Sequence, residues 1–272
     1  IQLATIRVIA ADTGATPDSG PTSGSRATFV QGVAVQAAAE ELRDHLLGMA
    51  AEMQHCGIEE LEVHDGEVFH IGTETPLLTV PAVAAEMHRL GKHTSSTGWQ
   101  DNFTQDVDPE TSQGDAYATY GWSTQMAEVE VDTDTGHVRV VNIVSATDAG
   151  KAINPAGVDG QIQGGAAMAI GYALYEEHIL DNGIPKTNSL AFYLVPTTMD
   201  VPDIFCEIVE VPDPKGPFGA KGVAEPATIP TTPAILNAIY DAIGVRVTEV
   251  PVTPERLFFA IQEARARGVA VD

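Results

Sequence analysis

The sequence predicts an α+β fold in which mixed sheets pack against helices, and three observations support this prediction. Short stretches of alternating apolar and polar residues, typical of strands with one buried face, occur in both halves of the chain. Longer stretches rich in Ala, Leu and Glu have the apolar spacing of helices. With 272 residues, of which 44% are hydrophobic, the chain is long enough to bury one large core or two smaller ones.

Residues 1–110 are predicted to form a first α+β lobe. Asp65-Gly66 between two alternating runs is typical of a tight hairpin, and Thr79 followed by Pro81 is typical of a helix start. In chain order, the expected elements are a strand at Leu3–Ile9, a loop at Ala11–Arg26, a helix at Ala27–Met53, a hairpin at Leu61–Phe69 and a helix at Leu78–Leu90.

Residues 111–272 are predicted to form a second α+β lobe, beyond a polar and irregular stretch. Asn154 and Pro155 supply a capping side chain and a first-turn proline, so a helix rich in Gly and Ala should begin there. In chain order, the expected elements are a hairpin at Ala127–Val144, a helix at Ala156–Leu174, strands at Tyr175–Leu180 and Ile204–Val211, and helices at Pro233–Ile243 and Pro254–Arg267.

The charge of the chain excludes two classes of partner. Thirty-eight Asp and Glu residues against fourteen Lys and Arg residues give a formal net charge of −24. A nucleic-acid backbone or an anionic membrane surface would be repelled. No stretch approaches the roughly 18 to 20 consecutive apolar residues that a membrane-spanning helix needs. We therefore expect neither nucleic acid nor membrane as a partner.

The two cysteines, Cys56 and Cys206, lie far apart in the sequence and lack the spacing of a zinc or iron–sulfur site. They are typical of buried thiols in a reducing compartment, which predicts a cytoplasmic location. The eight histidines also lack the spacing of metal ligands. No metal site made of protein side chains is therefore expected.

Three loops of small residues enter or lead toward predicted helices, where free backbone N–H groups can hold an anion. Each loop also carries one cation, which would suit an anionic ligand. For any single loop, a helix-entry turn with a solvated cation is the simpler alternative. The loops, with their cations, are Pro21–Arg26 with Arg26, Asp148–Gln161 with Lys151, and Gly216–Pro226 with Lys221.

Two further side chains are candidates for chemistry. Glu225 ends the third loop and is followed by a proline that fixes the backbone, a suitable placement for an acid/base group. Gln161, near the start of the small-residue helix, could present its amide to a ligand oxygen. In so acidic a chain, a surface glutamate and a solvated glutamine are the alternatives.

Four blocks of residues occur in order along the chain, which are Asp148–Pro155, Gly160–Gly165, Gly171–Glu177 and Gly219–Pro226. In these blocks the chain resembles the carboxy-terminal part of the molybdenum-binding subunit of the xanthine dehydrogenase and aldehyde oxidase family. The resemblance extends over nearly the whole sequence. It implies the α+β molybdopterin-binding fold of that family and a molybdopterin cofactor, usually the cytosine dinucleotide form in bacteria, whose own dithiolene holds the molybdenum.

The resemblance also implies roles for individual residues. Glu225 matches the family's catalytic base, which takes a proton from the water-derived nucleophile that attacks an electron-poor carbon. The residues that match cofactor-binding positions are Gly24, Ser25, Ala27, Lys151, Ala152, Ile153, Asn154, Gln161, Lys221, Gly222, Val223 and Ala224. Ala224 stands where many relatives have glycine, and a methyl group there would be costly if the position needed a positive φ.

The resemblance implies partners and leaves the substrate open. The upstream half of the molybdenum domain is expected on another chain or segment, and iron–sulfur clusters and possibly FAD on other subunits. The expected reaction is the oxidation of an N-heterocycle or an aldehyde, with water as the oxygen source. Two alternatives stay open, a nucleotide- or phosphate-binding module without redox chemistry and a redox-inactive interaction subunit.

Overall fold

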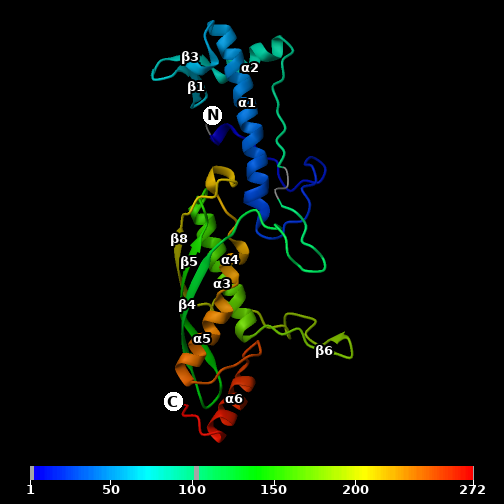
Figure 1. The fold of residues 1–272 in the computed structure, drawn as a ribbon, viewed down its shortest axis with the longest axis vertical. Helices are drawn as coiled ribbons and strands as arrows, with labels where there is room; N and C mark the ends of the chain where they lie inside the picture. The colour runs from blue at the N-terminus through cyan, green and yellow to red at the C-terminus, as the bar shows by residue number, and fades with distance from the viewer. Residues whose placement is uncertain (1–2, 101–103, 272) are drawn as a thin grey trace. The chain divides into compact units, whose positions relative to one another are not determined.

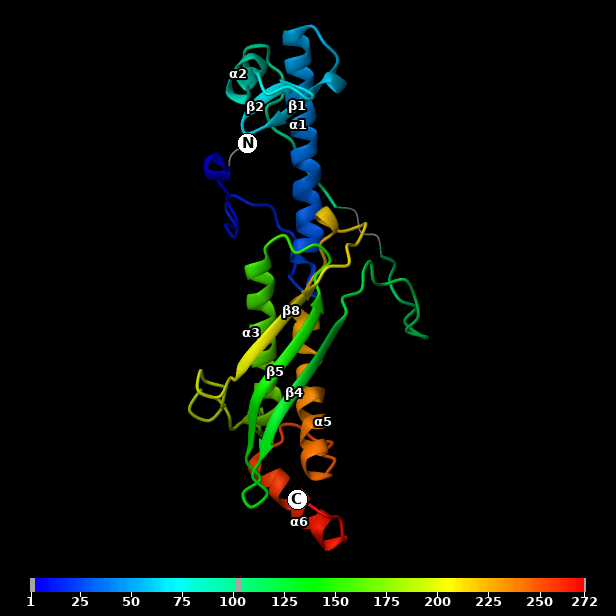
Figure 2. The ribbon, with the colours of Figure 1, turned by 90° about the vertical axis from the view of Figure 1, so that its left-hand side faces the viewer.

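The computed structural model describes residues 3–100 and 104–271, and the chain divides into two compact units (Figure 1, Figure 2). The first unit comprises Ile1–Ser23 and Ala27–Phe103, and the second comprises Gly24–Arg26 and Thr104–Asp272. The three residues Gly24–Arg26 thus belong with the C-terminal unit, although they precede the long helix of the first unit.

The first unit is built around one long helix that packs on a small sheet. A π-helical turn at Ala27–Gln31 leads into α1, so the predicted long helix is confirmed. The sheet is antiparallel in the order β1-β2-β3. The elements are α1 (Gly32–Gln54), β1 (Leu61–His64), β2 (Glu67–His70), β3 (Pro76–Thr79) and α2 (Val80–Arg89). Their shared core buries Leu47, Ala50, Val68, Val83 and Met87.

The predicted hairpin and second helix of this unit are confirmed. His64 of β1 pairs with Glu67 of β2 across the turn, as the Asp65-Gly66 pair predicts. The Thr79 hydroxyl accepts a hydrogen bond of 3.3 Å from Ala82 N–H and caps α2. This satisfies one of the free N–H groups that every helix start leaves.

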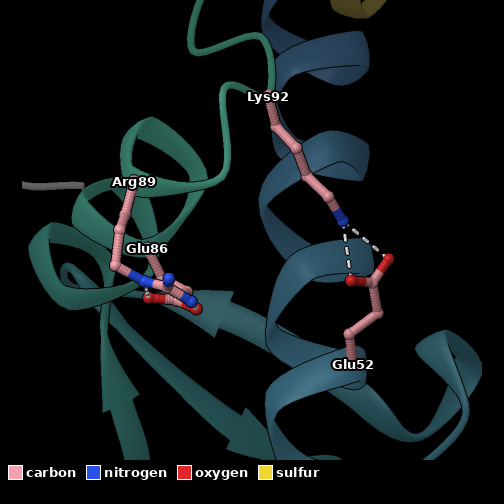
Figure 3. Close-up of polar contacts among 4 residues, drawn as sticks. All are labelled: Glu52, Glu86, Arg89 and Lys92. Atoms are coloured by element: carbon pink, nitrogen blue, oxygen red, sulfur yellow. Dashed lines mark hydrogen bonds and ion pairs between the residues drawn. The ribbon is translucent and has the colours of Figure 1, made fainter.

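Ion pairs lie on the surface of this unit (Figure 3). Lys92 Nζ contacts both carboxylate oxygens of Glu52 at 2.8 and 2.6 Å, which joins the segment after α2 to α1. Within α2, Arg89 Nε donates to Glu86 Oε2 at 2.7 Å. Solvent competes for exposed pairs of this kind, so they contribute little to stability. The apolar core holds the unit together.

The strand predicted at Leu3–Ile9 is wrong. Leu3–Thr5 is a short 3-10 turn, and the residues that follow it are irregular. Leu3 and Val8 are 87% and 78% exposed, and among the described residues the segment has no strand to pair with. Alternating apolar and polar residues form a strand only where a neighbouring strand can pair with them and a core can bury the apolar side chains.

The second unit is a three-stranded mixed sheet with helices on one face. β4 (Ser123–Val131) and β5 (Val138–Asp148) pair antiparallel, as predicted, and β8 (Asp203–Val209) pairs parallel to β5. The parallel pairing requires a crossover, which contains α3 (Pro155–Leu174). α3 and α5 (Thr231–Ile243) lie on the same side of the sheet in both views (Figure 1, Figure 2).

The core of the second unit lies between this sheet and its helices. It includes Ile143, Ile170, Ile235, Ile239 and Leu257, all fully buried. Leu257 belongs to α6 (Pro254–Ala266). The helices α5 and α6 begin within two residues of their predicted starts. In the described ranges, no helix combines the length and the apolar character needed to cross a membrane.

The strand predicted at Tyr175–Leu180 is also wrong. Tyr175 ends α3, because its N–H still donates to the Gly171 carbonyl. The chain then forms a separate two-stranded hairpin of β6 (Leu180–Asp181) and β7 (Ile184–Pro185). The apolar residues of this stretch are used to end a helix and to form a local turn, and not to extend the main sheet.

Candidate functional site

Two of the three predicted loops form one hydrogen-bonded structure. Lys221 N–H donates to the Ala149 carbonyl at 2.9 Å, and Lys151 N–H donates to the Gly219 carbonyl at 2.8 Å. Gly150, with a φ of +62°, allows this approach, since a Cβ there would lie 2.2 Å from Gly219 O. Glycine is required at this position for steric and conformational reasons.

The first loop in chain order, here Gly24–Arg26, joins the other two. Glu225 N–H donates to Ser25 Oγ at 3.0 Å, across 200 residues of sequence. Gly222 lies so close to this loop that a Cβ would come within 2.2 Å of Ser25 O. Gly24, by contrast, has a φ of +60° and open space where a side chain would be. The three loops therefore converge in the second unit.

The convergence point carries the candidate acid/base residue. Glu225 is exposed and lies in the first turn of the short helix α4 (Ala224–Thr228). Pro226 follows it and packs against the backbone of Gly121, where a Cβ would lie 2.9 Å from Pro226 Cγ. A short helix fixed by a proline keeps the Glu225 backbone in place, while its carboxylate remains accessible.

Ala224 needs no positive φ, which removes the concern about a methyl group there. It is the first residue of α4 and has an ordinary helical backbone. Gly222, Val223 and Ala224 are all half-buried. Ala27 begins the π-helical turn of the first unit.

The N-terminus of α3 presents a group of exposed residues. Asn154 caps the helix, and its Oδ1 accepts a hydrogen bond of 3.1 Å from Gly157 N–H. Ile153 is 54% exposed, whereas Ala152 is buried and its N–H donates to Glu210 Oε1 at 2.9 Å. Gln161 is exposed two turns into α3. Among the described residues, no hydrogen bond joins Gln161 to the three loops.

The cation of the third loop is neutralised within the protein. Lys221 Nζ lies 2.7 Å from Asp148 Oδ2, and the two side chains are only 8% and 6% exposed. Burial raises the pKa of Asp148, but the Lys221 ammonium and the N–H groups of Gly150 and Val211 outweigh it, so the net pKa lies below its usual value. The Lys221 side chain balances Asp148, so this loop can offer an anion its backbone only.

The other two loop cations lie at the surface. Lys151 Nζ pairs with Glu210 Oε2 at 2.9 Å, and both side chains are well exposed. This ammonium holds the pKa of the Glu210 carboxyl below its usual value. Arg26 is exposed and has no ion-pair partner within residues 3–100 and 104–271. Of the three cations, Arg26 is therefore the most accessible to a ligand.

Cys56 belongs to the first unit, and Cys206 lies on β8 of the second. Burial, and then the nearby Asp159 carboxylate, raise the pKa of the Cys206 thiol to about 11, which keeps it protonated at neutral pH. In the described parts of the chain, no group of three His, Cys, Asp or Glu side chains is arranged to hold a metal ion. Glu225 and Arg26 are exposed at the converging loops.

The sequence did not single out the polar residues beneath α4. Gln125 of β4 donates to the Ala227 carbonyl at 2.8 Å, and Ser145 and Thr147 of β5 are fully buried beside it. A signal was available, because Ser145 and Thr147 occupy positions on β5 that alternate with its outward residues. Polar residues on the buried face of a strand need partners.

A family model described as "Molybdopterin cofactor-binding domain" matches residues 1–202. The chain is 33% identical to 6-hydroxypseudooxynicotine dehydrogenase complex subunit gamma of Paenarthrobacter nicotinovorans, over 94% of this chain and 32% of that protein. It is also 33% identical to a probable xanthine dehydrogenase subunit of Bacillus subtilis (strain 168), over 94% of this chain and 33% of that protein.

The chain also matches solved structures in its fold. The structure of quinoline 2-oxidoreductase from Pseudomonas putida 86 superposes with a TM-score of 0.75 and 30% sequence identity. The match covers 89% of this chain and 31% of that one. The chain thus spans about a third of the length of the relatives that it matches.

Proposed function

Since the chain belongs to the xanthine dehydrogenase and aldehyde oxidase family and matches its molybdopterin cofactor-binding domain, we propose that it forms part of the molybdenum centre of a hydroxylase. The substrate would be an N-heterocycle or an aldehyde, with water as the oxygen source. The observation that carries this proposal is the convergence of three small-residue loops beside an accessible glutamate, Glu225.

The residues present fit a molybdopterin. Gly24 leaves open space where a side chain would be, so a flat or anionic group can approach its backbone. The exposed turn at Asn154 begins a helix of 20 residues, whose positive end favours phosphate. The residues proposed to hold the cofactor are Gly24, Ser25, Ala27, Lys151, Ala152, Ile153, Asn154, Gln161, Lys221, Gly222, Val223 and Ala224.

In the proposed mechanism, Glu225 is the general base. The cofactor, when bound, would supply the two-electron oxidation of the substrate carbon. Glu225 would take the proton from the water-derived nucleophile, and its placement on α4 would hold the accepting oxygen in position. Ser25 would hold the backbone of Glu225 in place, because its hydroxyl accepts a hydrogen bond from the Glu225 N–H.

The proposed partners are further subunits. Both the Paenarthrobacter and the Bacillus relatives are named as subunits, and the first as a subunit of a dehydrogenase complex. We propose that the upstream half of the molybdenum domain, iron–sulfur clusters and possibly FAD are supplied in the same complex. We also propose the cytosine dinucleotide form of the cofactor and a cytoplasmic location.

Metal and nucleotide analysis of the enzyme that contains this chain, purified with its partner subunits, tests the proposed function. We expect about one molybdenum per copy of this chain, and release of cytidine monophosphate after acid hydrolysis. A bound phosphate compound without molybdenum would instead support the non-redox binding module. A folded complex with neither would support the redox-inactive subunit.

Replacing Gly24 by Val should abolish cofactor retention. Its φ of +60° is strained for a β-branched residue, by at least about 1 kcal/mol, and the new side chain would fill the open space beside the loop. Neutralising Arg26 by Gln should lower molybdenum content only modestly, because backbone donors act at contact distance while salt screens an exposed charge. Molybdenum content after gel filtration is the measurement. Loss of molybdenum in Arg26→Gln, together with its retention in Gly24→Val, would refute the proposal that backbone groups hold the cofactor.

A further inference from the structure

The end of α4 depends on a side chain from another element. Pro230 lies two residues beyond the helix and has no N–H group, so it cannot donate to a carbonyl of the last turn. Gln125 Nε2 donates to another carbonyl of that turn, Ala227 O, at 2.8 Å. Gln125, near the start of β4, thus caps the C-terminal end of the helix that carries Glu225.

The orientation of the Gln125 amide is fixed by its neighbours. The Ala227 carbonyl can only accept a hydrogen bond, so the NH₂ group must face it. The hydroxyl of the fully buried Thr231 donates to the amide oxygen of Gln125 on the other side. Gln125 Nε2 also donates to Ser145 Oγ at 3.1 Å, and Ser145 Oγ lies 3.3 Å from Thr147 Oγ1.

α4 is therefore held at both ends and along its buried side. Ser25 accepts the N–H of Glu225, and Gln125 donates to the carbonyl two residues later. Ala227 is fully buried against α3, where a Cβ on Gly165 would lie 3.1 Å from Ala227 Cβ. The Glu225 residue itself stays exposed.

We infer that Gln125 is a positioning residue, which holds the backbone of α4 so that Glu225 points its carboxylate at the reacting atoms. The inference rests on the proposed role of Glu225 as the base. A base must lie within hydrogen-bond distance of the proton it takes, and a displacement of about 1 Å can cost on the order of 100-fold in rate.

The network is not a main support of the fold. The buried apolar cluster of the second unit, as described, contains residues of β5, α3, α5 and α6, with residues of β4 and β8 packed against it and none of α4. Removing the Gln125 amide would leave the Ala227 carbonyl and the Thr231 hydroxyl without this partner, while the apolar core stays intact. The expected damage is therefore local to α4 and the start of α5.

The test compares Gln125→Leu with Gln262→Leu in the enzyme purified with its partner subunits. Gln262 is exposed on α6, so the same substitution there is a matched control. For Gln125→Leu we expect kcat to fall at least about 10-fold, with KM and molybdenum content changed less than about twofold. Gln262→Leu should change none of these. A fall in molybdenum content that equals the fall in kcat would overturn the inference.

A double-substitution cycle separates this inference from the proposed function. If Gln125 acts through Glu225, then Gln125→Leu should have almost no further effect on the residual turnover of Glu225→Gln. An equal further loss in that background would refute positioning. Near-normal turnover of Glu225→Gln alone would refute the proposed function itself, and the positioning role of Gln125 with it.

Hydrogen exchange gives a readout that does not depend on turnover. A peptide covering residues 224–230 should exchange at least about 10-fold faster in Gln125→Leu, and at the normal rate in Gln262→Leu. Unchanged exchange would overturn the inference. If Gln125→Leu does not fold, Thr231→Val removes the hydroxyl that orients the amide, and Thr231→Ser restores it. Turnover should then be low in the first variant and recovered in the second.

Discussion

Replacing Glu225 by Gln is expected to lower kcat by at least about two orders of magnitude while molybdenum content stays unchanged. The amide has the shape of the carboxylate but cannot take up the proton. Glu225 is exposed, and its N–H donates to Ser25 Oγ in a bond that the substitution keeps. Folding should therefore be preserved. Steady-state kinetics and metal analysis on the same preparation measure both effects.

Glu249 offers a matched control. It is also exposed and lies in the loop before α6, so Glu249→Gln makes the same change in charge outside the three loops. Its turnover should stay normal. Normal turnover in Glu225→Gln, with full molybdenum content, would contradict the assignment of the base.

Replacing Lys221 by Met should destabilise the protein by about 3 to 5 kcal/mol, because it leaves the buried Asp148 carboxylate without its counter-charge. Lys151→Met is the matched control. Its partner Glu210 is well exposed, so water can replace the lost ammonium and a much smaller change is expected. Urea unfolding of both variants measures the difference. Equal effects would show that burial of the Lys221 pair does not matter.

The same pair predicts how stability depends on pH. The pKa of Asp148 is lowered in the folded protein, so its contribution to stability is present above its ordinary value of 3.8 and is lost as pH falls below it. In Lys221→Met, burial without a partner would raise the pKa of Asp148. The difference in unfolding free energy between the unsubstituted protein and Lys221→Met should therefore become smaller as the pH is lowered from 7 toward 4.

Local signals in the sequence predicted most of the elements. Thr79 and Asn154 cap helices at the expected positions, because a capping side chain satisfies N–H groups only a few residues away. The Asp65-Gly66 turn is equally local. The strands predicted at Leu3–Ile9 and Tyr175–Leu180 failed, because a strand exists only where another strand pairs with it.

The candidate site also combines features that local sequence predicts with contacts that it does not predict. Residue patterns predicted the small-residue loops, the helix start at Asn154, the placement of Glu225 before a proline and the resemblance to molybdenum hydroxylases. Three contacts appeared only in the folded chain, and they join Ser25 to Glu225, Lys221 to Asp148, and Gln125 to the end of α4. These contacts span between 73 and 200 residues of sequence. Hydrogen bonds and ion pairs depend on distance in space, which no local pattern of residues specifies.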